Sequence, residues 1–198
     1  EVAVGVEHLT RAMLARHAFL TGHAERATAF ALRMAGEMDD PPDPEVLAQA
    51  CLLCDLGNIA LPEALLSKAG PLDAEELERM RAHPGVGRQM LQHLVSDEDV
   101  LAAGIWHHER WDGGGYPDGL AGPATPALAR LVSVADALAA MTNVRPHRPA
   151  KPWSEAIAAL NDGAGTRFDP ELVEIANSTL ADLSDIFTAF GDANGSQD

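Results

Sequence analysis

One segment constrains the fold more than any other, the stretch PALARLVSVADALAAM over residues 126–141. Its composition predicts a long helix that is apolar on nearly every face. Such a helix has to be enclosed by other elements, since a surface helix needs a polar face. Asp136 lies inside it, and a buried carboxylate is costly unless it is paired or bound to a metal. The segment therefore predicts a long apolar helix that carries a functional acid.

The rest of the chain predicts further helices, with no alternating strand pattern of useful length and no internal repeat. Prolines in the stretch DDPPDP over 39–44 break one helix from the next. Gly57 predicts a left-handed cap for the helix that begins near Pro44, and Asp73 with Glu76 predicts a capping box. Residues 58–71 read as irregular chain with one short helical turn. The expected helices cover 6–20, 22–38, 44–55, 74–82, 84–95, 98–109, 126–141, 153–160 and 170–183.

These features predict an all-α, single-domain helical bundle, which suits a length of 198 residues. We expect residues 1–21 to form an N-terminal helix, the truncated link to an upstream domain, because the chain begins without Met. Residues 22–183 would form the bundle, and residues 184–198 a polar tail.

The charge of the chain excludes several classes of partner. It has 30 acidic and 14 basic residues and a formal net charge of −16. This argues against binding a nucleic-acid polymer or an anionic membrane. A small phosphate ligand is still allowed if metal ions and a few arginines reverse the field locally. No apolar stretch is long enough to span a bilayer, and two cysteines without a disulfide framework favour the cytoplasm.

Residues 106–117, WHHERWDGGGYP, are the strongest candidate for chemistry. His107 and His108 precede Glu109, and the glycines and Pro117 then stop any helix. Paired histidines before a rigid loop suit a metal site with a lip that contacts substrate. The alternative is a surface loop with two solvated histidines.

Other candidate ligands lie near expected helix ends, and each has an ordinary explanation. His23 after Gly22 could cap a helix, and His83 before Pro84 could be turn chemistry. Asp55 could be a last-turn carboxylate, although its charge would oppose the helix dipole. Asp136 has the weakest ordinary explanation, since its helix is apolar on nearly every face.

Over about residues 9–176 the chain resembles the HD-GYP domain, a branch of the HD phosphohydrolase superfamily. The resemblance implies an α-helical bundle that hydrolyses cyclic di-GMP to a linear dinucleotide or to GMP, with two or three bound metal ions, commonly iron or manganese. The matching stretches, in order, are GHAER from 22, LCDLGNI from 53, LP at 61, LSK at 66, MRAHPGVG from 80, HHERWDGGGYP from 107, VADAL from 134, MT at 141, RPHR from 145 and FDP from 168.

The resemblance also implies roles for individual residues. Asp55 would bridge two metals. His23 and Asp136, with Cys54, would hold the first metal, and His83, His107 and His108 would hold the second. Position 58 would serve catalysis with Asp55, and Tyr116, Arg145 and Arg148 would bind the substrate. Two ions held by such ligands activate water for in-line attack on a phosphodiester.

The chain departs from the HD-GYP pattern at several positions. Cys54 stands where the family has the histidine of its His-Asp dyad. As a thiolate ligand it would favour zinc or iron over manganese, and as a small buried hydrophobe it would weaken or lose the first metal. Asn58 replaces a lysine and brings no positive charge to the phosphate. Phe19 replaces a carboxylate, which argues against a third ion, and His147 replaces a tyrosine.

Two functions remain open on these grounds. The first is a metal-dependent cyclic di-GMP phosphodiesterase of reduced activity. The second is an inactive domain that binds cyclic di-GMP, or a protein partner through the Gly-Tyr-Pro loop. Cys51 and Cys54 also form a C-x-x-C pair. A zinc ribbon would need a second such pair, and the chain has none. A redox dithiol would need a βα context, which the sequence does not show. The truncated N-terminal helix also predicts weakened dimerisation.

Overall fold

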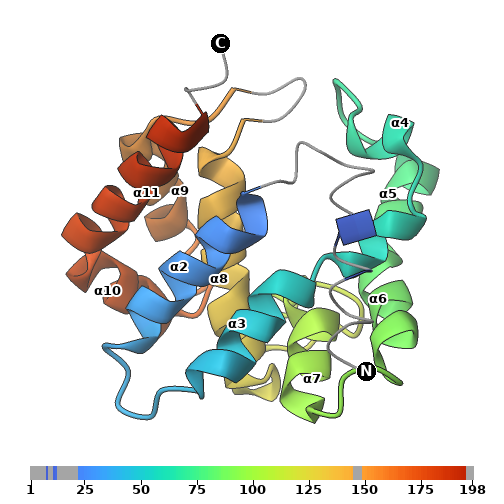
Figure 1. Ribbon diagram of the computed structural model, residues 1–198, viewed down its shortest axis with the longest axis horizontal. Helices are drawn as coiled ribbons and strands as arrows, with labels where there is room; N and C mark the ends of the chain where they lie inside the picture. Colours follow the sequence, from blue (N-terminus) through green and yellow to red (C-terminus); the bar gives the residue numbers. More distant parts are fainter. Residues whose placement is uncertain (1–7, 9–10, 13–21, 145–148, 195–198) are drawn as a thin grey trace.

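The long apolar helix predicted over 126–141 is α8 (Ala127–Thr142), which runs through the middle of the molecule (Figure 1). In this computed structural model, which describes residues 8, 11–12, 22–144 and 149–194, five helices pack against it. They are α2 (His23–Ala35), α3 (Pro44–Leu53), α7 (Glu98–Trp106), α9 (Trp153–Asp162) and α10 (Pro170–Ser178). Most of its apolar side chains, including Leu131 and Leu138, are fully buried.

The remaining elements complete an all-α bundle. No strand occurs in the described ranges, where only two isolated bridges interrupt the helical pattern. The prediction of an all-α fold is therefore confirmed. The other elements are η2 (Leu56–Ala60), α4 (Glu63–Leu66), α5 (Ala74–Arg81), α6 (His83–Leu91), η3 (Gly122–Ala124) and α11 (Leu180–Asn194). Of the expected N-terminal helix, residues 8, 11 and 12 alone are described, and they are helical. Phe19, Arg145, His147 and Arg148 lie outside the described residues.

The interior divides into two clusters of buried apolar side chains. The larger surrounds α8 and includes Phe30, Met34 and Leu160. The smaller lies between the end of α3, η2, α6 and α7, with Leu56 and Leu101 among its members. The turn between α3 and η2 lies where the two clusters meet, so both hold its backbone in place.

Aspartates begin four of the helices. The side chains of Asp43, Asp73, Asp97 and Asp169 accept hydrogen bonds from backbone N–H groups in the first turns of α3, α5, α7 and α10. Such caps satisfy donors that have no partner within the helix. The Asp73 backbone N–H also donates to the Glu76 carboxylate, and this reciprocal bond confirms the predicted capping box.

Several predicted helix boundaries differ from the structure. Helices α2 and α6 end at Ala35 and Leu91, before their predicted ends at 38 and 95. Helix α3 ends at Leu53, and Gly57 is not left-handed; its lack of a side chain matters because the backbone of α6 packs against it. Helix α7 ends at Trp106, a few residues before the predicted end at 109, so that the paired histidines follow it. The stretch 170–183 breaks at Thr179, whose hydroxyl donates to the Ile175 carbonyl.

The polar tail expected from residue 184 is helical as far as Asn194, in α11. Ile186 and Phe187 pack against the larger core, and this burial extends the helix beyond the point where the sequence becomes polar. Among the described helices, none combines the length and apolar character that crossing a bilayer requires.

Candidate metal centre

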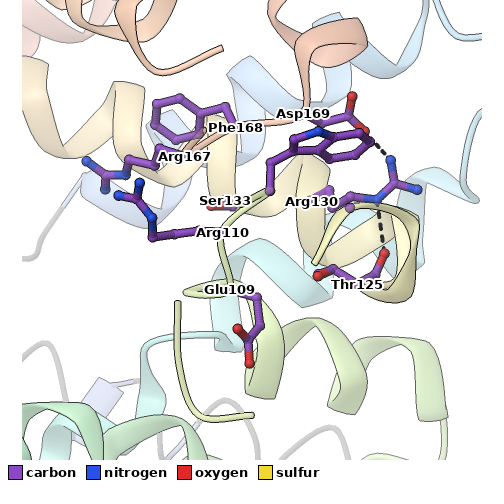
Figure 2. Close-up of a pocket in the computed structure, with 10 residues that line it drawn as sticks. Glu109, Arg110, Thr125, Arg130, Ser133, Arg167, Phe168 and Asp169 are labelled. Atoms are coloured by element: carbon purple, nitrogen blue, oxygen red, sulfur yellow. Dashed lines mark hydrogen bonds and ion pairs between the residues drawn. The ribbon is translucent and has the colours of Figure 1, made fainter. Parts of the chain in front are cut away.

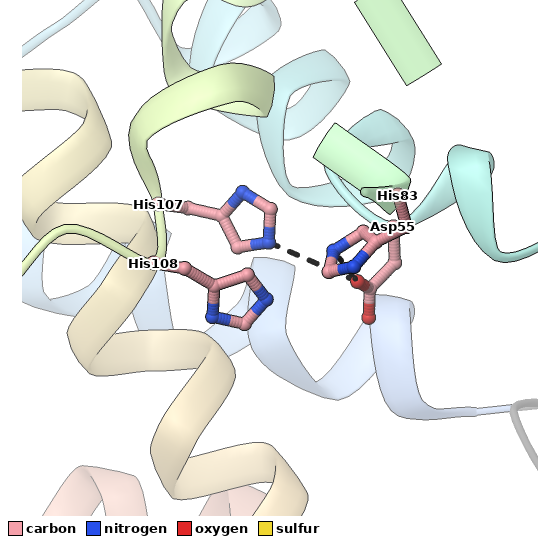
Figure 3. Close-up of side chains that lie close together, drawn as sticks. All are labelled: Asp55, His83, His107 and His108. Atoms are coloured by element: carbon pink, nitrogen blue, oxygen red, sulfur yellow. Dashed lines mark ion pairs between the residues drawn. The ribbon is translucent and has the colours of Figure 1, made fainter. Parts of the chain in front are cut away.

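Asp55 is the residue around which the candidate ligands gather. It lies in the turn between α3 and η2, where the chain leaves one helix and has not yet entered the next. Its carboxylate faces the imidazoles of His83, His107 and His108 (Figure 3). One candidate ligand atom from each of the four lies within 4.8 Å of the others. Segments distant in sequence thus place three nitrogens and one oxygen around a single point.

The backbone orients two of these imidazoles. Nδ1 of His83, the first residue of α6, lies 2.7 Å from the Met80 carbonyl oxygen. Nδ1 of His107, just after α7, lies 2.9 Å from the Gly104 carbonyl oxygen. A proton on Nδ1 then leaves the Nε2 lone pair free for a metal. The two Nε2 atoms lie 3.2 Å and 3.8 Å from Oδ1 of Asp55.

A second group shares the same carboxylate. His23, Asp55 and Asp136 bring three candidate ligand atoms within 4.8 Å of one another. His23 begins α2 after the left-handed Gly22, and its Nε2 lies 2.8 Å from Oδ1 of Asp136. The central helix therefore points its carboxylate at the first residue of α2. Asp55 belongs to both groups, which is the geometry of a bridging ligand.

The charges of the centre are strongly coupled. Burial alone would raise the pKa of Asp55, but His107 and His83 outweigh it and hold the pKa well below the usual range. Burial and the neighbouring imidazoles of His107 and His83 lower the pKa of His108. Burial opposes ionisation of Asp136 too, yet the hydrogen bond to His23 lowers its pKa. These interactions favour the ionised form of both carboxylates and the neutral form of His108.

The residues present fit divalent cations. Nε2 of His83 and Nε2 of His107 are buried and lack a hydrogen-bond partner, which is costly unless a further group binds there. Imidazole nitrogens and carboxylate oxygens form a donor set that suits iron, manganese or zinc. The carboxylates of Asp55 and Asp136 also supply negative charge to offset the cations.

The Gly-Tyr-Pro loop folds back over the histidines. The Tyr116 backbone N–H donates to the His108 carbonyl, and the Tyr116 ring stacks on the His108 ring at 4.8 Å between centroids and 21° between planes. Gly115 permits this return, because a Cβ there would lie 2.4 Å from the Arg110 nitrogen. The aromatic side chain thereby forms one wall of the centre.

Glu109 anchors the loop from inside. Its carboxylate is buried and accepts backbone N–H bonds from Asp118, Gly119 and Leu120, at 2.7, 3.0 and 3.1 Å. Three consecutive donors fix the far end of the loop against the residue that follows the paired histidines. Glu109 was not among the predicted site residues. Its place directly after two candidate ligands was the available signal.

Comparison with known proteins agrees with this arrangement. A profile of the HD domain matches residues 8–172. The chain is 34% identical over 193 residues to the cyclic di-GMP phosphodiesterase response regulator RpfG of Xanthomonas campestris, a match that covers 96% of this chain and 51% of RpfG. The chain belongs to the HD-GYP branch of the HD-domain family. The family prediction made from the sequence is confirmed.

Other relatives differ in the substrate that their names give. The 3'3'-cGAMP-specific phosphodiesterase 3 of Vibrio cholerae is 31% identical over 175 residues, covering 88% of this chain and 38% of that protein. Among solved structures, Bd1817, an HDG"Y"P protein from Bdellovibrio bacteriovorus, superposes with a TM-score of 0.65 at 26% identity, over 80% of this chain and 51% of that one. The chain spans about half or less of the length of these relatives.

In this HD-GYP domain, the Cys54 thiol bonds to the backbone of α3. It donates to the Cys51 carbonyl at 3.4 Å, and neither group of candidate ligand atoms includes it. Burial, with the negative charges of Asp55 and Asp136, raises the pKa of the thiol well above its usual value. A protonated thiol bonded along its own helix resembles a small core residue more than a ligand.

Asn58 lies one turn beyond Asp55 in η2 and is buried. Its Oδ1 has no hydrogen-bond partner within the described chain. The side chain brings no positive charge to the position at which HD-GYP domains usually have a lysine. Tyr116 lies beside the candidate ligands, and Cys54 belongs to neither ligand group. The structure thus brings together six of the predicted metal ligands, His23, Asp55, His83, His107, His108 and Asp136.

Proposed function

We propose that this domain is a metal-dependent cyclic di-GMP phosphodiesterase with reduced activity. The observation that carries the proposal is the membership of Asp55 in both groups of candidate ligand atoms. In this proposal, Asp55 would contribute a ligand to both of two divalent ions. His23 and Asp136 hold one ion, while His83, His107 and His108 hold the other. Iron or manganese suits the nitrogen and oxygen donors, and zinc would be favoured if Cys54 rotated to become a ligand.

When bound, two such ions activate water at neutral pH and stabilise the attacking and leaving oxygens of a phosphodiester. The protein supplies the alignment. Hydrogen bonds from the Nδ1 atoms of His83 and His107 to backbone carbonyls fix both rings before an ion arrives. Tyr116, stacked on His108, closes one side of the centre and limits how a substrate can approach. Arg145 and Arg148 remain proposed phosphate or base contacts.

The changes at positions 54 and 58 support a reduced rate. A neutral Asn58 cannot stabilise the charge that develops on the phosphate as a lysine would. Loss of one such electrostatic contact typically costs about 10²–10³ in rate. The Cys54 thiol leaves the group of His23, Asp55 and Asp136 with one ligand fewer than the HD-GYP pattern supplies.

These two changes also favour a second candidate function, binding of cyclic di-GMP without turnover. The exposed tip of the loop, at Pro117, Asp118 and Gly119, would then be free for a protein partner. In either case we propose that the domain works in the cytoplasm, because Cys51 and Cys54 are both free thiols.

Anaerobic reconstitution with Fe²⁺ or Mn²⁺, followed by chromatography of the products from cyclic di-GMP and from 3'3'-cGAMP, tests the proposal. We expect slow turnover of cyclic di-GMP that chelator abolishes. Asp55→Ala should lose turnover and both ions, because it removes the shared ligand. The control Asp182→Ala removes an aspartate of α11 that is paired with Arg33. This variant should keep both its turnover and its metal ions.

Turnover that survives in Asp55→Ala would contradict the metal assignment. Tight binding of cyclic di-GMP without turnover by the metal-loaded protein would establish the second function instead.

A further inference from the structure

Arg81 lies at the edge of the proposed site without an assigned role. It is the last residue of α5, two residues before the candidate ligand His83. Its guanidinium carbon lies 5.3 Å from the centroid of the Tyr116 ring, which in turn stacks on His108. One aromatic ring therefore separates this cation from a candidate metal ligand.

Arg167 lies beside the start of the Gly-Tyr-Pro loop, although it comes from a distant part of the chain. The turn that carries it is bound to the start of the Gly-Tyr-Pro loop. The Asp112 N–H donates to the Thr166 carbonyl at 2.8 Å, and the Trp111 N–H donates to the Arg167 carbonyl at 3.3 Å. In Figure 2 the side chains of Arg167 and Arg110 extend to the same side, away from Arg130.

The Arg167 side chain lines the same pocket as Arg110 and Trp111, beside the start of the Gly-Tyr-Pro loop. Its guanidinium carbon lies 4.9 Å from the centroid of the neighbouring Phe168 ring. Arg81 and Arg167 therefore lie beside the two ends of the loop that covers the histidines.

Neighbouring cations are already paired with carboxylates. Arg110 makes a two-pronged contact with Asp112, at 2.9 and 2.5 Å. Arg79 pairs with Glu75 and Lys68 pairs with Glu76. Arg81 and Arg167 are exposed and make no ion pair with any residue that the structure describes. In a chain of net charge −16, two cations left without carboxylates beside a candidate active site are available to an anionic ligand.

We propose that Arg81 and Arg167 bind the phosphate groups of the cyclic dinucleotide. This inference rests on the proposed function and names the side chains that recognise its dianionic substrate. Guanidinium groups present several N–H donors in a plane and match phosphate oxygens well. Together the two arginines supply substrate-binding charge that the neutral Asn58 does not.

The test is equilibrium binding of a hydrolysis-resistant phosphorothioate analogue of cyclic di-GMP to the full chain loaded with Mn²⁺. Arg81→Met and Arg167→Met remove the charge while keeping an unbranched stem. Each should weaken binding about ten-fold, the size expected for one hydrogen-bonded charge contact. The double variant should weaken binding about 100-fold. Arg79→Met, on the same helix but paired with Glu75, is the matched control and should bind within about two-fold of the parent.

Two further readouts separate ligand binding from a structural role. The manganese content of the variants should equal that of the parent. Added salt should weaken binding by the parent more than by the double variant, because fewer charge contacts remain to be screened. Normal binding by both arginine variants would overturn this inference and leave the proposed function intact. Failure of the parent itself to bind the analogue would overturn both.

Discussion

Tyr116 is the only tyrosine of the chain, so its ionisation can be followed by absorbance without interference. Burial and the carboxylates of Asp55 and Asp136 raise the pKa of its hydroxyl, and the nearby arginines only partly offset them. In a rapid pH jump on metal-free protein, we expect the tyrosinate signal to appear at a higher pH than that of an unperturbed tyrosine, which titrates near about pH 10.

Protein unfolded in urea is the control, and its midpoint should return to about pH 10. Arg81→Met should raise the native midpoint further, since it removes one of the opposing cations. A native midpoint at or below that of the unfolded chain would contradict the burial of Tyr116 beside the two carboxylates.

Cys54 and Asn58 give the second prediction at this scale. Cys54→His combined with Asn58→Lys restores an imidazole beside Asp55 and a cation one turn later. We expect phosphodiesterase activity to rise by about 10²-fold, mostly from the added charge. Each single variant, assayed with the same metal, shows how much of the gain in activity comes from that substitution. An unchanged rate in the double variant would show that neither residue limits the reaction.

Individual residues were predictable only in part. The motifs located Asp55, His83, His107, His108 and Asp136, because their types and order carry the chemistry. The orientation of the Cys54 thiol was not predictable, since either a ligand or a core residue fits its position in the sequence. The packing around α3 decides it. The anchoring role of Glu109 depends on a return of the loop that no local pattern encodes.

At the scale of elements, Gly57 holds two helical segments in contact. A Cβ at this position would lie 1.9 Å from the His83 carbonyl oxygen and 2.8 Å from the Gly87 nitrogen. Gly57→Ala must therefore push α6, and with it His83, away from Asp55. We expect a loss of about 3 kcal/mol in the free energy of unfolding, measured by urea denaturation, and weaker metal binding.

Gly85→Ala is the matched control within α6, because a Cβ there meets nothing within 4 Å. It should leave metal binding unchanged and stabilise the helix by about 0.5–1 kcal/mol. Equal stability of Gly57→Ala and the parent would contradict the close packing of η2 on α6.

The elements themselves were largely predictable, since apolar spacing and proline breaks located most of the helices. Their ends were less so. Helix α7 stops at Trp106 because the following residues turn to form the centre, and α11 continues past residue 184 because Ile186 and Phe187 find a buried surface. Both outcomes depend on tertiary contacts, which a local pattern does not contain.

For the whole molecule, metal binding and folding should be coupled. The candidate ligands come from α2, the α3–η2 turn, α6, the end of α7 and α8. An ion that binds only the folded chain stabilises it by about 2.7 kcal/mol at a hundred times its dissociation constant. We expect Mn²⁺ to raise the melting temperature of chelator-treated protein by about 5–10 °C.

Asp55→Ala should show no such shift, while Asp182→Ala should respond as the parent does. An equal rise in melting temperature for Asp55→Ala would place the stabilising ion elsewhere in the protein.

The all-α class of the fold followed from the helical spacing of the apolar residues and from the lack of an alternating strand pattern. The sequence did not reveal that Arg81 and Arg167 would lie beside the same Gly-Tyr-Pro loop. That juxtaposition requires the path of the chain in three dimensions.

The position of α8 has a consequence for how the protein is made. A chain still growing on the ribosome lacks both Asp136 and the helix on which the others pack until α8 has been synthesised. Folding and metal loading therefore wait for the same stretch of translation.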